Sequence, residues 1–346
     1  MWNGWEDSPA VCGKDGSMKR NSGYTLIEWM IAIVIGLFIF GGLMSLYVIS
    51  NETTQDSLDN GELQENGRIG MNLLLRDLRM AGFWGDYTGV PLSLGAGVTL
   101  STAASTLSSS SDCLDSRSIG SFPGVSGNLR SAWTLHVNAS GNKGSSLACI
   151  NLASGAAFSP DSDIIDIKRA QGNSIADATV LDSSHFYIAA NTQALNFFKG
   201  SETRPTITAM PNRQVWEYIR HIYYISSQNS VPELHMMYLT DSIQDTAIVR
   251  GIERMRILFA IDSTLTPNGV IDSYIAPENV TQQQWDERRV LGAKLFLLVR
   301  SIDASNKYVN PNTYALGDIS YTPADNYRRL LLQSTVIFNN SGDSTQ

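Results

Sequence analysis

The stretch that decides the fold runs from residue 23 to residue 49 and reads GYTLIEWMIAIVIGLFIFGGLMSLYVI. Its last 21 residues, from Trp29 to Ile49, contain no charged side chain. As a helix that rises about 1.5 Å per residue, they are roughly 31 Å long, which matches the hydrocarbon thickness of a bilayer. The sequence therefore predicts a transmembrane helix close to the amino terminus.

The charges on the two sides of this helix differ in sign. Lys19 and Arg20 precede the apolar run, whereas Glu52 and Asp56 follow it. Because positively charged flanks stay in the cytoplasm, we expect the amino terminus there. The residues beyond 50 are then expected on the other side of the membrane.

One carboxylate, that of Glu28, lies directly against the apolar run. An acid at the edge of the hydrocarbon is costly, so it is usually functional and has a partner. If the chain is cut after Gly23, the new amino group of Tyr24 becomes that partner, in the same helix or in a neighbouring one. The alternative is a glutamate that extends to water at the membrane surface without a partner.

The sequence from Gly23 to Glu28, followed by an unbroken apolar helix, resembles the prepilin cleavage and methylation signature of type IV pilin-class proteins. The resemblance implies that prepilin peptidase cuts between Gly23 and Tyr24 and methylates the amino group of Tyr24. It also implies that Glu28 pairs with the amino terminus of a neighbouring subunit during assembly. Two departures are Tyr24, where phenylalanine is usual, and Ser45, near the point where major pilins often carry a helix-bending proline. The missing proline argues against a major pilin.

The resemblance makes residues 1–23 a leader peptide. This leader is long for the class, and a start at Met18 would leave the six residues MKRNSG, which is more typical. We therefore expect residues 1–17, with Cys12, to be a misassigned start. Residues 24–50 then form the transmembrane half of the amino-terminal helix.

The helical pattern continues over residues 51–84. Apolar and small residues recur there every three or four positions, at Leu63, Gly67, Met71, Leu74, Leu75 and Leu78. This is the period of one helix face. No proline interrupts the segment, and Gly82 supplies a stop. One helix is therefore predicted from near Thr25 to near Met80, with its amphipathic second half packed on a sheet.

Residues 85–346 are expected to form a β-rich globular domain. Several runs alternate apolar and polar residues, as half-buried strands do. The predicted strands are Trp133–Val137, Ile164–Arg169, Phe186–Ala189, Val215–Ile225, Leu234–Leu239, Ile248–Ile261, Leu291–Arg300 and Leu330–Phe338. No strong helix separates them, so the sheet should be largely antiparallel. The expected fold class is α+β and pilin-like, with an exposed Ser- and Gly-rich insertion at residues 99–128.

Three segments resemble the PilW family of minor pilins. They are LRDLRMAGFWG at residues 75–85, RGIERMRILF at 250–259 and VRS at 299–301. The first segment is also similar, more loosely, to the J-type pseudopilins of type II secretion. The PilW pattern often continues with a cysteine where this chain has Asp86, so any disulfide must be arranged differently.

The cysteines fit an oxidising compartment once the leader is removed. Cleavage after Gly23 removes Cys12 and leaves Cys113 and Cys149 as a pair. A bridge between them would close a loop of 37 residues. Such a bridge stabilises a fold by roughly 3–4 kcal/mol. The alternative is three buried thiols in a cytosolic protein, but the membrane helix favours the disulfide.

Neither the charge nor the motifs favour nucleic-acid binding or catalysis. The net charge is −8, and no run of basic residues suggests a nucleic-acid site. The four histidines lack the spacing of a metal site: His136, His185, His221 and His235. Asp161-Ser162-Asp163 lacks the other ligands of a calcium loop and is more typical of a cap at the start of an element. We therefore expect no cofactor, no metal, no catalytic residue and no enzyme.

The resemblance implies a minor pilin, a structural subunit that helps to initiate type IV pilus assembly and lies at or near the pilus tip. It implies other minor pilins and the major pilin as partners, a large tip adhesin as a further candidate, and prepilin peptidase as the processing enzyme. The protein is then a single-pass protein of the bacterial inner membrane, with its carboxy-terminal domain in the periplasm, before it joins the extracellular pilus. Two alternatives are a J-type pseudopilin and a membrane-anchored adhesin that binds carbohydrate or a surface.

Overall fold

The computed structural model describes residues 23–89, 92–95, 97–107, 112–113, 120–124, 128–305 and 308–338. Most of the expected leader, residues 1–22, and the serines at 108–111 lie outside this part of the chain. The chain divides into two compact units, Met1–Ser57 and Leu58–Gln346.

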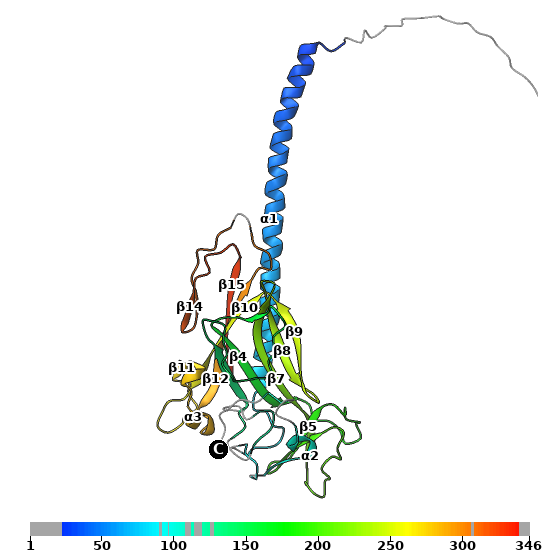
Figure 1. The fold of residues 1–346 in the computed structure, drawn as a ribbon, viewed down its shortest axis with the longest axis vertical. Coiled ribbons are helices and arrows are strands. Elements are labelled where there is room, and N and C mark those ends of the chain that lie inside the picture. Colours follow the sequence, from blue (N-terminus) through cyan, green and yellow to red (C-terminus); the bar gives the residue numbers. More distant parts are fainter. Residues whose placement is uncertain are drawn as a thin grey trace, which may run out of the picture. The chain divides into compact units, whose positions relative to one another are not determined.

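Helix α1 runs without a break from Leu26 to Met80, as predicted (Figure 1). In the first unit its large apolar side chains are exposed along the whole predicted membrane span. The helix is long and apolar enough to cross a membrane. A surface of this kind is stable in lipid or against other apolar helices and unstable in water.

In the second unit, residues 58–80 of α1 pack on a β-sheet along one face. The buried positions are Leu63, Gly67, Gly70, Met71, Leu74, Asp77 and Leu78. Gly67 allows a close approach, because a Cβ at this position would lie 2.5 Å from Leu332 Cδ1 and 2.9 Å from Val299 Cγ2. The prediction that the second half of the helix packs on a sheet is therefore confirmed.

The first sheet of this unit has nine strands. They are β1 (Val98–Leu100), β2 (Ala132–Val137), β3 (Ala157–Phe158), β4 (Ser162–Ala170), β5 (Phe186–Ala190), β6 (Leu195–Lys199), β7 (Gln214–Gln228), β8 (Val231–Leu239) and β9 (Ile243–Arg250). Six of them follow the order β1-β6-β5-β7-β4-β2, while β3 and β8 pair with β7, and β9 pairs with β8. All pairs are antiparallel except β1–β6.

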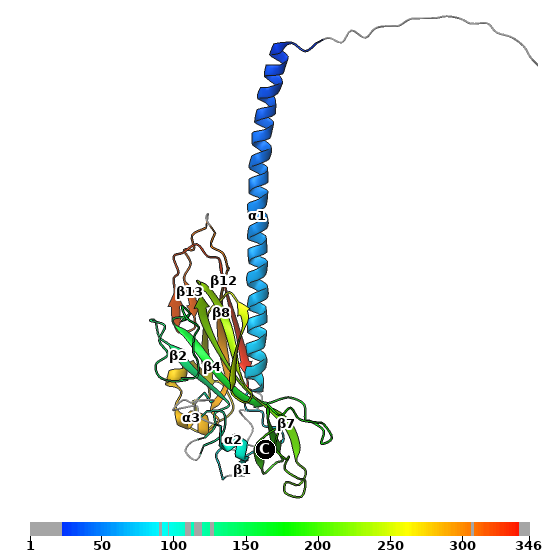
Figure 2. The same ribbon diagram turned by 45° about the vertical axis from the view of Figure 1, so that its right-hand side comes forward.

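The second sheet has four antiparallel strands in the order β11-β10-β12-β15. They are β10 (Ile252–Ile261), β11 (Ser273–Ile275), β12 (Val290–Arg300) and β15 (Arg329–Ile337). The remaining elements are the hairpin β13 (Tyr314–Leu316) and β14 (Ile319–Tyr321), and the short helices α2 (Thr102–Ser105), η1 (Pro277–Asn279) and α3 (Gln282–Asp286). A hydrophobic cluster joins Leu74 and Leu78 of α1 to Ile167 of β4, Ile257 of β10 and Leu297 of β12. Figure 2 shows the carboxy-terminal part of α1 beside the strands of this unit.

Side chains of β4 join the two sheets. The Ser162 hydroxyl accepts a hydrogen bond from the Met255 amide at 3.0 Å, and the Asp163 carboxylate accepts one from the Ile257 amide at 2.9 Å. Asp163 is buried. Asp161-Ser162-Asp163 does lie at the start of β4, but Asp163 bonds to the middle of β10 and is not a cap.

Seven of the eight predicted strands correspond to single strands, but Ile248–Ile261 forms two. Gly251, with a φ of +81°, separates β9 from β10. Its amide donates to the Pro232 carbonyl, and its carbonyl accepts from the Arg300 amide. The chain therefore leaves one sheet and joins the other at this glycine, which is the residue best suited to a positive φ.

Part of the Ser- and Gly-rich stretch at 99–128 contributes to the core. Residues 99, 102, 105 and 106 are exposed as expected, but the expectation is wrong for residues 112–113 and 120–123, which are buried. Cys113 and Phe122 are buried. The Phe122 ring contacts those of Phe186 and Phe197. Only a few apolar residues make these contacts, and the surrounding serines mask them in the composition.

Candidate functional site

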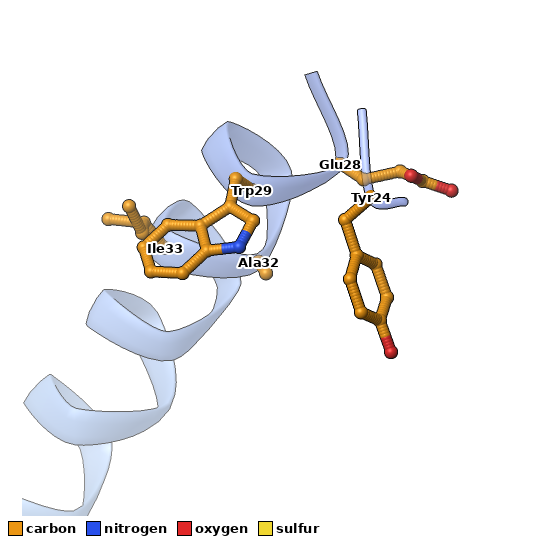
Figure 3. Close-up of a pocket in the computed structure, with 5 residues that line it drawn as sticks. All are labelled: Tyr24, Glu28, Trp29, Ala32 and Ile33. Atoms are coloured by element: carbon orange, nitrogen blue, oxygen red, sulfur yellow. The ribbon is translucent and has the colours of Figure 1, made fainter. Parts of the chain in front are cut away.

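The predicted processing site lies at the start of α1 (Figure 3). The Glu28 amide donates to Thr25 Oγ1 at 3.3 Å. In return, Glu28 Oε2 accepts from the Thr25 amide at 2.8 Å and from the Thr25 hydroxyl at 3.0 Å. These reciprocal bonds form a capping box, in which two residues satisfy amides that the first turn of a helix leaves free.

Glu28 therefore has a local partner that we did not foresee from the sequence. The signal was present, because Thr-x-x-Glu before an apolar run is the pattern of a capping box. Both bonds from Thr25 end on Oε2. This leaves Oε1 open to a partner from outside the described residues.

An apolar hollow opens beside the capping box. It is lined by Tyr24, Trp29, Ala32 and Ile33, together with Glu28. In Figure 3 the Glu28 carboxylate points away from the Trp29 ring. The start of the helix thus combines an apolar surface with one negative charge.

Asp77 bonds helix α1 to the first sheet of the second unit. Its Oδ1 accepts from Arg169 Nη2 at 2.6 Å and from Nε at 3.1 Å. Its Oδ2 accepts from the Tyr223 hydroxyl at 2.6 Å and contacts Nδ1 of His221. Burial alone would raise the pKa of Asp77, but the hydrogen bond and charge of His221, with Arg169 and Tyr223, hold this pKa well below its usual range. We call these four residues the Asp77 clamp.

A cluster of buried charges lies beside the disulfide. Cys113 and Cys149 form a disulfide, as predicted. Arg220 donates to Asp112 at 2.6 Å, to Asp166 at 2.8 Å and to the Cys113 carbonyl at 2.7 Å. Burial opposes its charge, but Asp166 and Asp112 outweigh burial and raise the pKa of Arg220 above its usual value. The disulfide therefore holds Asp112 next to a fully buried guanidinium.

Lys168 completes this cluster. Its ammonium lies 3.1 Å from the Asp166 carboxylate, and both side chains are fully buried. Burial lowers the pKa of Lys168 to about 8. Lys168 and Arg220 balance Asp112 and Asp166, as buried charges require. The cluster thus ties the segment around Cys113 to strands β4 and β7.

All four histidines pair with carboxylates through Nδ1. The pairs are His136–Asp163 at 2.9 Å, His185–Glu217 at 2.8 Å, His235–Asp245 at 3.3 Å, and His221–Asp77. The hydrogen bond to Asp163 raises the pKa of His136, with burial opposing it. In the part of the chain that the structure describes, no group of three or more His, Cys, Asp or Glu side chains is placed to hold a metal ion.

The predicted site residues fall into two groups. Gly23, Tyr24 and Glu28 belong to the first unit, and Cys113 and Cys149 belong to the second. Sequence reasoning missed the Asp77 clamp. The sequence feature that could have revealed the clamp is Asp77 itself, because it lies among the apolar residues of the predicted buried face, and a buried charge needs partners.

Two family models match the chain. Residues 222–340 match PilW, described as Type IV Pilus-assembly protein W, and residues 18–44 match the prokaryotic N-terminal methylation motif. The first match begins in β7 and extends beyond β15, and the second contains the capping box. No curated protein and no solved structure matches the chain.

Proposed function

We propose that this chain, which belongs to the PilW family of type IV pilus-assembly proteins, helps to initiate pilus assembly and lies at or near the pilus tip. The family is structural, so the chain is a minor pilin-like subunit and not an enzyme. Its methylation motif and apolar helix suit anchoring in the inner membrane before assembly. The observation that carries the proposal is the continuous helix α1, which begins within the methylation motif and ends in the globular unit.

The structure of the helix start suggests how the subunit enters a filament. Cleavage between Gly23 and Tyr24 would leave an ammonium group on Tyr24, beside the capping box. Because Thr25 binds Oε2 of Glu28, the carboxylate is held at the first turn, and no described residue is bonded to its Oε1, which can receive an amine. The exposed apolar helix can leave lipid only where neighbouring helices cover it. We therefore infer that Glu28 pairs with the amino terminus of a neighbouring subunit as the helices assemble.

Two features support a place at or near the tip. The globular unit extends over Leu58–Gln346, and a domain of this size is easier to accommodate at the end of a filament, where fewer neighbours surround it. Helix α1 also contains no proline, in keeping with a minor pilin. The inferred partners are the other minor pilins and the major pilin, with a large tip adhesin as a further candidate and prepilin peptidase as the processing enzyme. The globular unit is inferred to face the periplasm before assembly.

The two alternatives draw less support. A J-type pseudopilin would share the helix and its motif, but the globular unit matches PilW. An adhesin with an aromatic carbohydrate platform would need exposed rings on β7. The Trp and Tyr rings of β7, those of Trp216, Tyr218, Tyr223 and Tyr224, are buried instead.

The proposal is tested by deleting the gene and restoring it with a tagged copy. We expect few pili without the protein, recovery with the tagged copy, and gold-labelled antibody at pilus tips in electron micrographs. Normal pilus numbers in the deletion strain, or label spread along the shaft, would contradict the proposal. A defect in protein secretion with normal pili would favour the pseudopilin alternative.

A further inference from the structure

Strand β15, drawn in red in Figure 1, is the outer strand of the second sheet. In the described part of the chain it pairs only with β12. The Phe338 amide donates to the Leu291 carbonyl, and the Arg328 carbonyl accepts from the Ser301 amide. Arg328 and Phe338, which flank β15, therefore direct these backbone groups toward β12, and both residues have even numbers. Because amides alternate in direction along a strand, the amides of Leu331, Gln333, Thr335 and Ile337 point away from the sheet.

This edge lacks the features that usually protect a sheet edge. Natural edges are shielded by charges, prolines, bulges, shortness or a covering element. The one charged residue of β15 is its first, Arg329, whose guanidinium pairs with Glu253 and Asp325. Residues 330–338 read LLLQSTVIF and contain no charge, proline or glycine. The pairing of β15 with β12 continues without a register shift from Arg329 to Ile337. An edge that is long and regular, and uncharged after Arg329, favours pairing with another chain.

The other edges of the described sheets are protected. Strand β9 pairs with β8 through a register shift at Leu234/His235, and it carries Asp245 and Arg250. Strands β1, β11, β13 and β14 are three residues long, and β3 is two residues long. Strand β2 lies against η1. Among the strands that the structure describes, β15 is thus the one whose edge is both long and unshielded.

We propose that the outer edge of β15 binds an extended segment of another pilus-assembly protein, which adds a strand to the second sheet. This inference rests on the proposed function, because it takes the partner from the pilus. The backbone of an added strand can form hydrogen bonds with the outward-pointing amides and carbonyls of β15. These bonds give affinity without requiring a particular side chain. The Ile337 side chain is 62% exposed, with Gln333 and Thr335 exposed on the same face. The added strand should therefore present apolar residues at alternate positions near Ile337.

The geometry disfavours a second copy of this chain as the occupant. Two β15 edges related by a two-fold axis would pair antiparallel. Residues 58–80 of α1 pack on the same sheet, so this axis would also reverse the direction of one helix relative to the other. Subunits anchored in one membrane by the start of α1 must all point the same way. The edge therefore suits a different subunit, whose strand need not obey this symmetry.

Thr335→Pro tests the edge with little effect on the rest of the sheet. It removes an amide that points outward, and proline is tolerated at such positions of edge strands. Thr335→Ala is the matched control, because it changes the same side chain and keeps the amide. The tagged full-length protein is purified from cells that make the other pilus proteins, and the co-purified pilin subunits are measured by mass spectrometry. We expect Thr335→Pro to lose them by about tenfold, and Thr335→Ala to retain them with an unchanged melting temperature in both variants.

Hydrogen exchange on the same samples gives a second readout. The amides of Leu331, Gln333, Thr335 and Ile337 should exchange slowly in the complex and fast in the isolated protein. If Thr335→Pro retains its partners and these amides exchange equally in both states, the inference is overturned and the pilus role stands. If the wild-type protein co-purifies with no pilin subunit, the proposed function fails instead. A crosslinked homodimer that Thr335→Pro abolishes would assign the edge to a second copy and overturn the inference.

Discussion

Glu28 combines two interactions that single substitutions can separate. Its Oε2 accepts from Thr25 in the capping box, whereas its charge would serve a neighbouring amine. Glu28→Gln keeps an acceptor for Thr25 and removes the charge, whereas Glu28→Ala removes both. We expect both variants to be inserted and cleaved but depleted in pili by about tenfold or more, because breaking a pair in apolar surroundings leaves the partner charge unmatched. Immunoblots of sheared pili give the measurement.

Two further results sharpen this prediction. Glu28→Asp keeps the charge on a shorter side chain and should be intermediate. Glu28→Ala should also weaken the first turn of the helix, by about 1 kcal/mol, through loss of the cap. Normal pilus numbers with normal co-purification of pilin subunits in Glu28→Gln would show that the charge is not an assembly contact.

Asp77 attaches helix α1 to the first sheet through its bonds to Arg169, His221 and Tyr223. Asp77→Ala leaves the Arg169 guanidinium without its carboxylate, so we expect a loss of about 3–5 kcal/mol in the free energy of unfolding. Asp241→Asn is the control: it breaks an exposed pair with Lys199 and should cost less than about 1 kcal/mol. Urea denaturation of the purified variants at neutral pH checks both values.

The same carboxylate predicts a pH dependence. The pKa of Asp77 is lower in the folded protein than the value of about 3.9 in an unfolded chain. A depressed pKa contributes stability that is present above the unfolded value and is lost as the pH falls through the folded value. The difference between wild type and Asp77→Ala should therefore shrink on acidification below about pH 4. A difference that stays constant down to about pH 2 would mean that the charge of Asp77 is not responsible.

At the scale of elements, the packing of α1 on the second sheet depends on small residues. A Cβ at Gly67 would overlap Leu332 and Val299. We expect Gly67→Ala to destabilise the protein by about 1–3 kcal/mol, reduced by the helix propensity that alanine adds. Gly61 lies on the same helix, and a Cβ added there would have no neighbour within 4 Å, so Gly61→Ala should be neutral or stabilise by up to about 1 kcal/mol. Melting temperatures of the two variants distinguish the effect of packing from that of helix propensity. Equal shifts in melting temperature for Gly67→Ala and Gly61→Ala would rule out the packing argument.

The second prediction at the scale of structural elements concerns the disulfide. Replacing Cys113 and Cys149 together by serine should lower the free energy of unfolding by roughly 3–4 kcal/mol. Because Arg220 bonds to Asp112 and to the Cys113 carbonyl, the amides near Cys113 should also exchange faster. Treatment of the wild-type protein with a thiol reductant provides the control and should give the same shift. Rapid alkylation of both cysteines without reductant would contradict the disulfide.

For the molecule as a whole, the sequence was informative where a pattern is periodic. An uncharged apolar run, followed by apolar residues at intervals of three or four, predicted one helix from near Thr25 to near Met80, and α1 runs from Leu26 to Met80. The alternation of apolar and polar residues predicted most of the long strands, because successive side chains of a strand point to opposite faces of the sheet. The partners of the buried charges were not predictable, because Asp77 and His221 are 144 residues apart and meet only through the order of the strands. The core role of Phe122 was hidden because its ring contacts, with Phe186, Phe197 and Tyr218, come from three different strands.

The final prediction concerns processing of the whole chain. We expect the mature protein to begin at Tyr24 with a methylated amino group, whichever methionine starts translation. Before cleavage, Lys19 and Arg20 hold the amino end in the cytoplasm, since charged side chains do not cross the hydrocarbon readily. Cleavage after Gly23 removes both and leaves a single ammonium, which a carboxylate such as that of Glu28 can neutralise. Only then can the apolar helix leave the bilayer.

The intact mass of the membrane-extracted protein decides this point. Wild type should have the mass of residues 24–346 with one added methyl group. Gly23→Val should keep its leader, remain in the membrane and be absent from pili, because the bulky side chain blocks the cut and the basic residues stay attached. Glu28→Ala is the matched control, since it should be cleaved and yet fail to assemble. An intact leader in cells with active prepilin peptidase, or normal assembly of uncleaved Gly23→Val, would mean that release from the membrane does not depend on this cleavage.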